Sequence, residues 1–205
     1  MLKRRIAVLV SGGGTNLQAL IDRQQAGDIP HGQLTVVIAD NPQAYALQRG
    51  EKAGLAVAAI PRRQMSQEQF EGELQATLEK YDIEVIVLAG FLCILSANFL
   101  RKWQERVINI HPSLIPSFCG KGFYGLRVHQ AALDYGVKVT GATVHFVNEI
   151  PDGGKIILQK AVAVLPDDTP ETLQRRVMEE AEWQLLPQAV EMVCAKLCEE
   201  QADRE

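Results

Sequence analysis

The chain has 205 residues, a size typical of one substantial domain. Hydrophobic residues make up 47% of the sequence and charged residues 22%, which is enough for an apolar core and argues against bulk disorder. The formal net charge of −4 argues against broad nucleic-acid binding, which needs a basic face. It does not exclude the binding of a small anion.

No apolar run reaches the length of a membrane span, so we expect no membrane association. The basic start and the apolar run Ile6–Val10 superficially resemble a signal peptide, but the run is too short and a helical pattern follows at once. We therefore expect a buried first strand and a cytoplasmic protein. The four cysteines form no metal-ligand set with histidine, which argues against a zinc site, and disulfides are not expected.

Short apolar runs alternate with helical patterns over the first half of the chain. Strands are predicted at Ile6–Val10, Leu34–Ala39, Val57–Ile60, Val85–Ala89 and Val107–Ile110. Helices are predicted between them at Thr15–Gln25, Ala44–Ala53, Gln67–Tyr81 and Ala97–Trp103. Ser66 and Gln69 form a capping box before the third helix. This order predicts a twisted, largely parallel sheet with right-handed crossovers.

The pattern changes after His111, where a Pro- and Gly-rich loop begins and Ile115–Pro116 is a candidate for a cis bond. A short helix near Leu126–Tyr135 follows. Two further strands, Val139–Val147 and Lys155–Val164, are interpreted as antiparallel additions to the sheet.

A long helix over about Pro170–Cys198 closes the chain. Asp168 and Thr169 are candidate caps before Pro170, because proline is favoured at the first helical position. Pro187 lies inside this helix and is expected to kink or break it.

A glycine-rich turn, Ser-Gly-Gly-Gly-Thr-Asn at residues 11–16, joins the first predicted strand to the first helix. It lacks the lysine of a P-loop and the third glycine of a dinucleotide fingerprint, although Asp40 does end the second strand. Glycines allow close backbone approach, and the helix N-terminus offers free N–H groups. A phosphate site is favoured over an empty tight turn, because three glycines lose much entropy on folding.

Asn109 and His111 lie two residues apart at a strand end, so their side chains share one face at the edge where open α/β sheets bind ligands. There an imidazole can act as a general acid and an amide can donate to a carbonyl oxygen. A hydrogen-bonded structural histidine explains His111 equally well on geometry alone. Asp152 before two glycines is by default a turn residue, but near His111 it would favour the imidazolium. His145 is expected in the core or behind the site.

Five segments together resemble the phosphoribosylglycinamide formyltransferase family, the folate-dependent transformylases of purine synthesis. They are SGGGTNLQALI, VIVLAGFLCILS, VINIHPSLIPSF, GATVHFVNEIPDGGKIILQKAV and AEWQLLP. The resemblance runs from about Ile6 to Pro187, and the Asn-Ile-His-Pro-Ser-Leu and His-Phe-Val…Asp-Gly-Gly blocks are specific to folate formyltransferases. With the alternation of elements, it implies an α/β, Rossmann-like fold in a single formyltransferase domain over residues 1–205. We expect a mostly parallel twisted sheet with helices on both faces, C-terminal antiparallel strands and a long terminal helix.

The resemblance implies direct transfer of the formyl group of 10-formyltetrahydrofolate, a co-substrate, to the amine of N1-(5-phosphoribosyl)glycinamide, with no metal. By position, Asn109 resembles the amide that orients the carbonyl, His111 the general acid, and Asp152 the acid that keeps this histidine protonated. Amine attack builds charge on the formyl oxygen, and each donor aimed at it contributes about 3 kcal/mol in comparable sites.

Binding residues follow from the same match. The ribonucleotide site is implied to contain Gly14, Thr15, Asn16 and Glu182. The folate site is implied to contain Gln67, Leu92, Cys93, Ile94, Leu95, Asn109, Asn148, Glu149, Ile150, Pro151 and Asp152.

The sequence departs from the family pattern at four places. One of them is Trp183 after Glu182, where the family usually has a Glu-His pair. Many relatives have arginine where this chain has Cys93, so any side-chain contact made by that arginine is lost. Many also have arginine near Gln67, where it meets the glutamate tail of the folate. An insertion after Phe118 carries Lys121, for which a phosphate contact or no contact are both open.

Formyltetrahydrofolate hydrolase is the alternative activity, but such relatives usually carry an N-terminal regulatory domain, for which a resemblance starting at Ile6 leaves no room. Methionyl-tRNA formylation usually needs a longer C-terminal domain and a basic surface. A nucleotide-binding module without catalysis leaves the Asn109 and His111 block unexplained. The expected partners are the two small-molecule substrates, with no nucleic acid and no membrane, in a monomer or homodimer.

Overall fold

The computed structural model describes residues 3–203, and seven of its strands form one sheet in the order β3-β2-β1-β4-β5-β6-β7. The strands are β1 (Arg4–Val10), β2 (Gly32–Ala39), β3 (Ala56–Ala59), β4 (Val85–Leu88), β5 (Val107–His111), β6 (Val139–Phe146) and β7 (Ile156–Ala163). The first five strands are mutually parallel, whereas β6 and β7 are added antiparallel. The predicted mixed sheet is therefore confirmed.

The helices also follow the predicted order. They are α1 (Thr15–Gln25), α2 (Tyr45–Lys52), α3 (Gln67–Lys80), α4 (Ala97–Arg101), α5 (Leu126–Tyr135), α6 (Pro170–Val177) and α7 (Trp183–Ala202), with a 3-10 turn η1 (Arg62–Gln64) and a π-helical segment η2 (Met178–Glu182). The capping box of Ser66 and Gln69 is present, and Thr169 caps α6. Asp168 instead pairs with Arg176.

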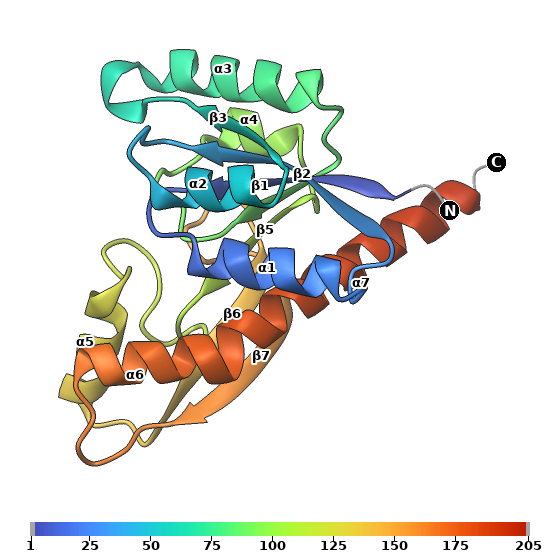
Figure 1. The fold of residues 1–205 in the computed structure, drawn as a ribbon. Coiled ribbons are helices and arrows are strands. Elements are labelled where there is room, and N and C mark those ends of the chain that lie inside the picture. The colour runs from blue at the N-terminus through green and yellow to red at the C-terminus, as the bar shows by residue number, and fades with distance from the viewer. Residues whose placement is uncertain (1–2, 204–205) are drawn as a thin grey trace.

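Alternation along the central strand explains why helices cover both faces of the sheet. Ile6, Val8 and Val10 of β1 pack in one core with residues of α1, α6 and α7. Ala7 and Leu9 point to the other side, into a second core with α3 and α4. Figure 1 shows α3 and α4 on one side of the sheet and α1 alongside α7 on the other.

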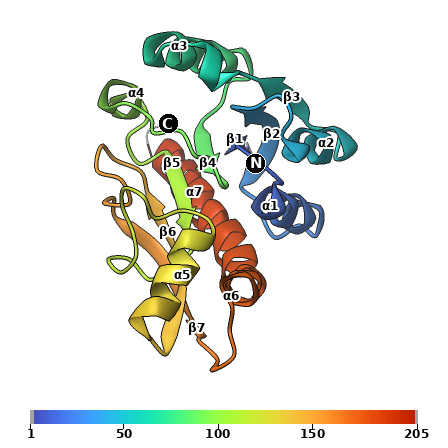
Figure 2. The same ribbon diagram turned by 90° about the vertical axis from the view of Figure 1, so that its left-hand side faces the viewer.

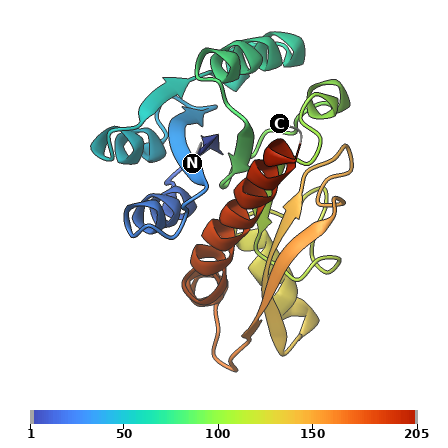
Figure 3. The same cartoon turned by 90° about the vertical axis from the view of Figure 1, so that its right-hand side faces the viewer.

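The last helical stretch is not the single helix over Pro170–Cys198 that the sequence predicts. The π-helical η2 interrupts it, and α6 and α7 run in different directions in Figure 1. The expected irregularity exists, but its place is wrong, because α7 continues through Pro187 and the interruption lies one turn earlier. Figure 3 shows α7 passing diagonally across the molecule. Such π segments are frequent at functional sites.

The order of the strands reverses between β1 and β4, which are neighbours in the sheet. Chain segments that leave the carboxyl ends of β1 and β4 diverge there, and open α/β sheets bind ligands at such a point. The 112–125 loop follows β5 and contains the cis peptide bond between Ile115 and Pro116, the isomer that the sequence left open. After it, α5 packs beside α6, as Figure 2 shows.

Two findings concern ions and membranes. In the part of the chain that the structure describes, no helix is long and apolar enough to cross a membrane. Residues 3–203 likewise contain no group of three or more His, Cys, Asp or Glu side chains placed to hold a metal ion.

Candidate active site

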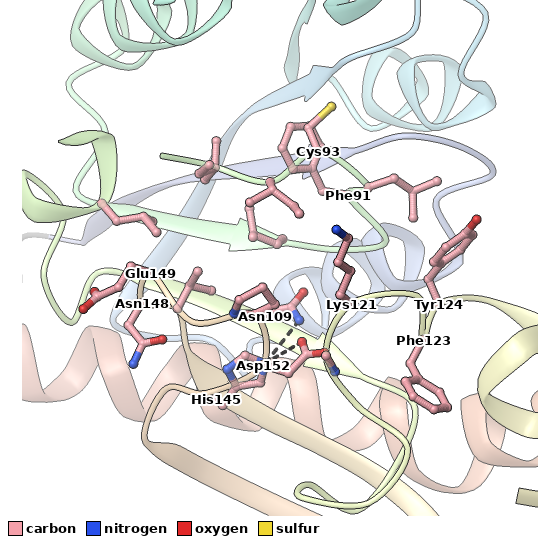
Figure 4. A pocket seen from close by; sticks show the side chains of 18 of the residues that line it. Phe91, Cys93, Asn109, Lys121, Phe123, Tyr124, His145, Asn148, Glu149 and Asp152 are labelled. Atoms are coloured by element: carbon pink, nitrogen blue, oxygen red, sulfur yellow. Dashed lines mark hydrogen bonds and ion pairs between the residues drawn. The ribbon is translucent and has the colours of Figure 1, made fainter. Parts of the chain in front are cut away.

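A network of four side chains lies at the ends of β5 and β6 and on the loop that follows β6. Asn109 Nδ2 lies 3.2 Å from His145 Nε2, and His145 Nδ1 lies 2.8 Å from the carbonyl oxygen of Phe146. Asp152 faces both histidines, with carboxylate oxygens 3.5 Å from His111 Nδ1 and 3.6 Å from His145 Nε2. Figure 4 shows Asn109, His145 and Asp152 clustered at the base of a cavity.

Strand register brings this network together. In the antiparallel pair of β5 and β6, Asn109 lies opposite His145 and His111 opposite Thr143. Side chains directly opposite one another on such a pair are in contact range. Thr143 braces the following loop, because its hydroxyl donates to the Ser113 carbonyl and accepts from the Ile115 N–H. The Asn-x-His pair of β5 therefore meets the Thr-x-His pair of β6.

Asp152 is placed by a loop that needs its two glycines. Its own φ is +56°, and an added Cβ on Gly154 would lie 1.7 Å from the Phe146 carbonyl oxygen. An added Cβ on Gly153 would lie 2.6 Å from the Ile150 side chain. The Gly120 N–H donates to Asp152 Oδ2 at 2.8 Å and so fixes the carboxylate from the opposite side. Asp152 is thus a held carboxylate and not an ordinary exposed turn residue.

The charge of His111 is set by two opposing effects. Burial lowers the pKa of His111 below its ordinary value, while the Asp152 carboxylate and the Phe118 carbonyl, 2.9 Å from Nε2, oppose this. Burial also acts on Asp152, where it raises the pKa. Contacts with His145, His111 and the Gly120 N–H outweigh it and leave the pKa of Asp152 below its usual range. Asp152 therefore favours the imidazolium as expected, but burial outweighs it and favours the neutral imidazole.

One cavity, which we call the loop cavity, opens beside this network and has a volume of about 430 Å³. It is lined by Leu88, Leu100, Asn109, His145 and residues 91–95, 120–124, 147–149 and 151–152. The lining is largely apolar, and two of its side chains, Leu92 and Ile94, are more than 60% exposed. Nine of the eleven residues expected in the folate site line it. Gln67 and Ile150 do not.

Gln67 and Cys93 have structural contacts of their own. The Gln67 amide donates to the Ile94 carbonyl and accepts from Arg62, so it braces the loop after β4 from outside the cavity. The Cys93 thiol lies 3.0 Å from Asp40 Oδ2, and burial together with this contact raises the pKa of Cys93 to about 12. Cys93 is therefore an uncharged wall residue.

A second cavity, the helix cavity, has a volume of about 270 Å³ and adjoins the loop cavity, with which it shares lining residues. It is lined by Asn16, Gln174, Met178, Glu182, Asp152 and residues 90–92, 109–112 and 123–125. Six residues line both cavities, and two of them, Asn109 and Asp152, are candidate catalytic groups; the others are Phe91, Leu92, Phe123 and Tyr124. His111 lines only the helix cavity, so Asn109 and His111 do share one face as predicted.

Asn16 and Glu182 form the polar wall of the helix cavity. Asn16 Nδ2 donates to Glu182 Oε2 at 2.7 Å, and both side chains are buried. Burial raises the pKa of Glu182 to about 6, against the effect of the Asn16 hydrogen bond. Glu182 lies in η2, so the π segment that sequence periodicity missed carries a candidate binding residue.

Backbone conformation and packing explain one of the three glycines in the turn at residues 11–16. Gly14 has a φ of +74°, and an added Cβ would lie 2.7 Å from the Cβ of Ala46 in α2. An added Cβ on Gly12 or on Gly13 would have no atom within 4 Å beyond its chain neighbours. No side chain caps α1, so its first N–H groups are available to an anion. Thr15 is exposed and lines a separate cavity with Arg49 and Trp183.

His145 is the functional candidate that the sequence placed in the background. Its ring joins Asn109 to Asp152. The alternation of Thr143 and His145 on a strand after the Asn-x-His strand was the available signal, but it becomes informative only once β5 and β6 are known to pair.

Comparisons with known proteins show which family the chain resembles. A family model described as formyl transferase matches residues 4–190. The chain is 43% identical over 195 residues to a trifunctional purine biosynthetic protein adenosine-3 of Bos taurus, covering 94% of this chain but 18% of that protein. It is 38% identical to a phosphoribosylglycinamide formyltransferase of Haemophilus influenzae, covering 90% of this chain and 84% of the relative.

A solved structure, glycinamide ribonucleotide transformylase 1 from Symbiobacterium toebii, superposes with a TM-score of 0.88 at 40% identity. The match covers 95% of this chain and 89% of that one. The family model spans far more than half of the sequence, and the Haemophilus relative is matched over most of its own length. The chain therefore belongs to the formyl transferase family.

Proposed function

We propose that the protein transfers the formyl group of 10-formyltetrahydrofolate to the amine of N1-(5-phosphoribosyl)glycinamide, a step of purine biosynthesis, as a phosphoribosylglycinamide formyltransferase. One domain spanning the chain carries the reaction. Names of similar proteins support this activity, including the phosphoribosylglycinamide formyltransferase of Haemophilus influenzae. Cytoplasmic location and a monomeric or homodimeric state stay predictions.

The observation that carries the proposal is the meeting of two cavities at Asn109 and Asp152. A transfer between two substrates needs two binding spaces with one shared wall, because the reacting atoms must approach to about 3–3.5 Å. The largely apolar loop cavity suits the ring system of a folate donor, and the polar helix cavity suits a ribonucleotide. Asn109 and Asp152, the two candidate groups on the shared wall, would then lie beside the formyl carbon that is transferred.

The reaction balances without a covalent enzyme intermediate. The amine nitrogen attacks the formyl carbon, and the carbonyl electron pair moves to oxygen. The tetrahedral intermediate then collapses by cleavage of the bond between the formyl carbon and N10. The proton released by the amine ends on N10, so the products are the N-formyl ribonucleotide and tetrahydrofolate.

Asn109 is proposed to stabilise the developing negative charge. Its amide nitrogen carries two hydrogens, so after one is donated to His145 a second donor is left. A preorganised donor of this kind stabilises the oxyanion without reorganisation, by about 3 kcal/mol.

Asp152 and His111 are proposed to hold and move the proton. Asp152 stays ionised because its pKa is lowered, and it lies next to His111 Nδ1. An oxyanion that forms nearby attracts a proton to His111, which burial otherwise keeps neutral. The charged imidazole is then favoured in the transition state more than in the free enzyme, which is the requirement for catalysis.

On the acceptor side, Asn16 and Glu182 are proposed to bind the ribonucleotide, and the uncapped N-terminus of α1, after Gly14 and at Thr15, to bind its phosphate. On the donor side, residues 92–95 and 148–152 are proposed to contact the folate, mainly through apolar surface and backbone.

One assay tests the proposal. Purified protein is given 10-formyltetrahydrofolate with and without the ribonucleotide, and tetrahydrofolate and the N-formyl product are both measured. We expect equal amounts of the two products, and only when the ribonucleotide is present. Release of tetrahydrofolate without the ribonucleotide would instead indicate the hydrolase. No turnover at all would contradict both activities.

A further inference from the structure

Lys121 is the one Lys or Arg among the described residues that line the loop cavity. Figure 4 shows its side chain extending from its loop toward the segment that carries Phe91, with Glu149 on the far side of the cavity. Within residues 3–203, no carboxylate forms an ion pair with its ammonium group. The cavity therefore holds one positive charge whose counter-charge is not supplied by these residues.

The loop around Lys121 is held in place by backbone conformation and hydrogen bonds. Gly120 and Gly122 flank it with φ values of +86° and +96°, a region that other residues rarely adopt. The Gly120 N–H donates to Asp152 Oδ2, and the nearby Phe118 carbonyl accepts from His111. The loop is thus tied by its backbone to two of the candidate catalytic residues, and this fixes where Lys121 emerges.

The donor that we propose for this cavity brings the matching charge. 10-Formyltetrahydrofolate carries a glutamate moiety with two carboxylates, which are ionised at neutral pH. The position at which many relatives carry an arginine for the glutamate tail is Gln67 here, and Arg62, which donates to it, does not line the cavity. Cys93 is an uncharged thiol directed at Asp40, and Gln67 lies outside the cavity. Lys121 is then the available partner for a carboxylate that extends from the apolar part of the cavity.

Resting on the proposed function, we propose that Lys121 recognises the glutamate moiety of the folate donor and sets the preference for glutamate-bearing folates. The contact lies near the cavity mouth and is solvent-accessible, since the lysine is exposed. Its contribution is therefore that of a partly screened ion pair and falls as salt is added.

Equilibrium binding without turnover tests the inference. Calorimetry measures the Kd of tetrahydrofolate and of tetrahydropteroate, which lacks the glutamate, for the wild type and for Lys121→Ala. We expect the variant to weaken tetrahydrofolate binding about threefold to fivefold and to leave tetrahydropteroate binding unchanged. Lys121→Arg keeps the charge and retains most of the affinity. Lys138→Ala, at an exposed lysine just before β6, is the matched control and has no effect.

Two results would overturn the inference. An equal loss for both folates would show that Lys121 supports the loop and does not read the glutamate. Weakened binding confined to the ribonucleotide would assign the charge to a phosphate. Because no catalysis is needed, a protein without formyl transfer that still shows the glutamate-dependent loss would disprove the proposed function and keep Lys121 as a folate contact. An active enzyme whose folate binding ignores Lys121 would do the reverse.

Discussion

The loop cavity and the helix cavity differ in what builds them. The loop cavity is walled by apolar side chains on connecting segments, including the strongly exposed Leu92 and Ile94. The helix cavity shares some of these connecting segments, but it adds buried polar groups on regular elements: Asn16 on α1, Glu182 on η2 and His111 on β5. A buried polar wall discriminates strongly between ligands, because a ligand that leaves a buried polar group without a hydrogen bond loses binding free energy. An apolar wall instead spreads its contribution to binding over many small contacts. Substitutions in the two cavities should therefore differ in size.

The largest effect is expected at two of the candidate catalytic residues. His111→Ala and Asp152→Asn should each lower kcat by about 100-fold to 1,000-fold, because proton transfer and oxyanion stabilisation are lost together. Binding of the ribonucleotide, measured by calorimetry, should change less than about threefold. His31→Gln, a histidine paired with Glu191 away from both cavities, is the control. An unchanged kcat in either variant would remove that residue from the mechanism.

The next effect concerns the turn that positions α1. Gly14→Ala should destabilise the protein by about 2 to 3 kcal/mol, because it combines a positive φ with a close approach to Ala46. Gly13→Ala is the matched control, with open space around its Cβ, and should change the stability by less than about 0.5 kcal/mol. Urea denaturation measures both. Equal losses would show that the packing of α1 on α2 does not explain Gly14.

The ionisation of Glu182, in the wall of the helix cavity, makes the stability of the protein depend on pH. Its pKa in the folded protein, about 6, lies above the ordinary 4.5, so the buried carboxylate destabilises the fold above pH 6 by about 2 kcal/mol. The penalty shrinks as the pH falls through 6 and is absent only well below 4.5, because the group is then protonated in both the folded and the unfolded state. Glu182→Gln should therefore be more stable than the wild type at pH 8, and this advantage should be lost near pH 3.5.

The same variant should bind the ribonucleotide about tenfold more weakly, since a charge-assisted hydrogen bond is lost. Thermal melts at the two pH values and calorimetry at pH 8 measure both effects. A variant that is less stable than the wild type at pH 8 would contradict the assigned burial penalty.

The smallest effect is expected in the loop cavity. Cys93→Ala should change the KM for the folate donor by less than about threefold, because the thiol is neutral, directed at Asp40 and one of many wall contacts. Steady-state kinetics at saturating ribonucleotide measure this. A change above about tenfold would mean that single side chains in this wall carry specific recognition, and the contrast between the two cavities would fail.

The parts of the fold that could be predicted are those with a strong local signal. Buried parallel strands appear as short apolar runs, and α1 begins and ends where its pattern does, at Thr15 and Gln25. The π segment could not be predicted, because one extra residue in a turn barely alters the periodicity over residues 170–202. Pro187 correctly predicts that the last helical stretch is irregular, but it does not predict where the irregularity lies.

The candidate site divides in the same way. Asn109 and His111 could be paired from the period of a single strand, which is a local property. His145 could not, because its contact with Asn109 depends on the antiparallel register of two strands separated by a long loop and α5. The charge preference of His111 could not be predicted either, since burial is a property of the folded chain.

A ternary complex tests the central claim, that two cavities present their substrates to each other across Asn109 and Asp152. A crystal structure would be determined with the ribonucleotide and an unreactive folate analogue that keeps a carbonyl carbon at the position of the formyl group. We predict the amine nitrogen in the helix cavity about 3 to 3.5 Å from that carbon, beside Asn109 and Asp152. Both ligands in one cavity, or reacting atoms separated by the 148–154 loop, would contradict the account.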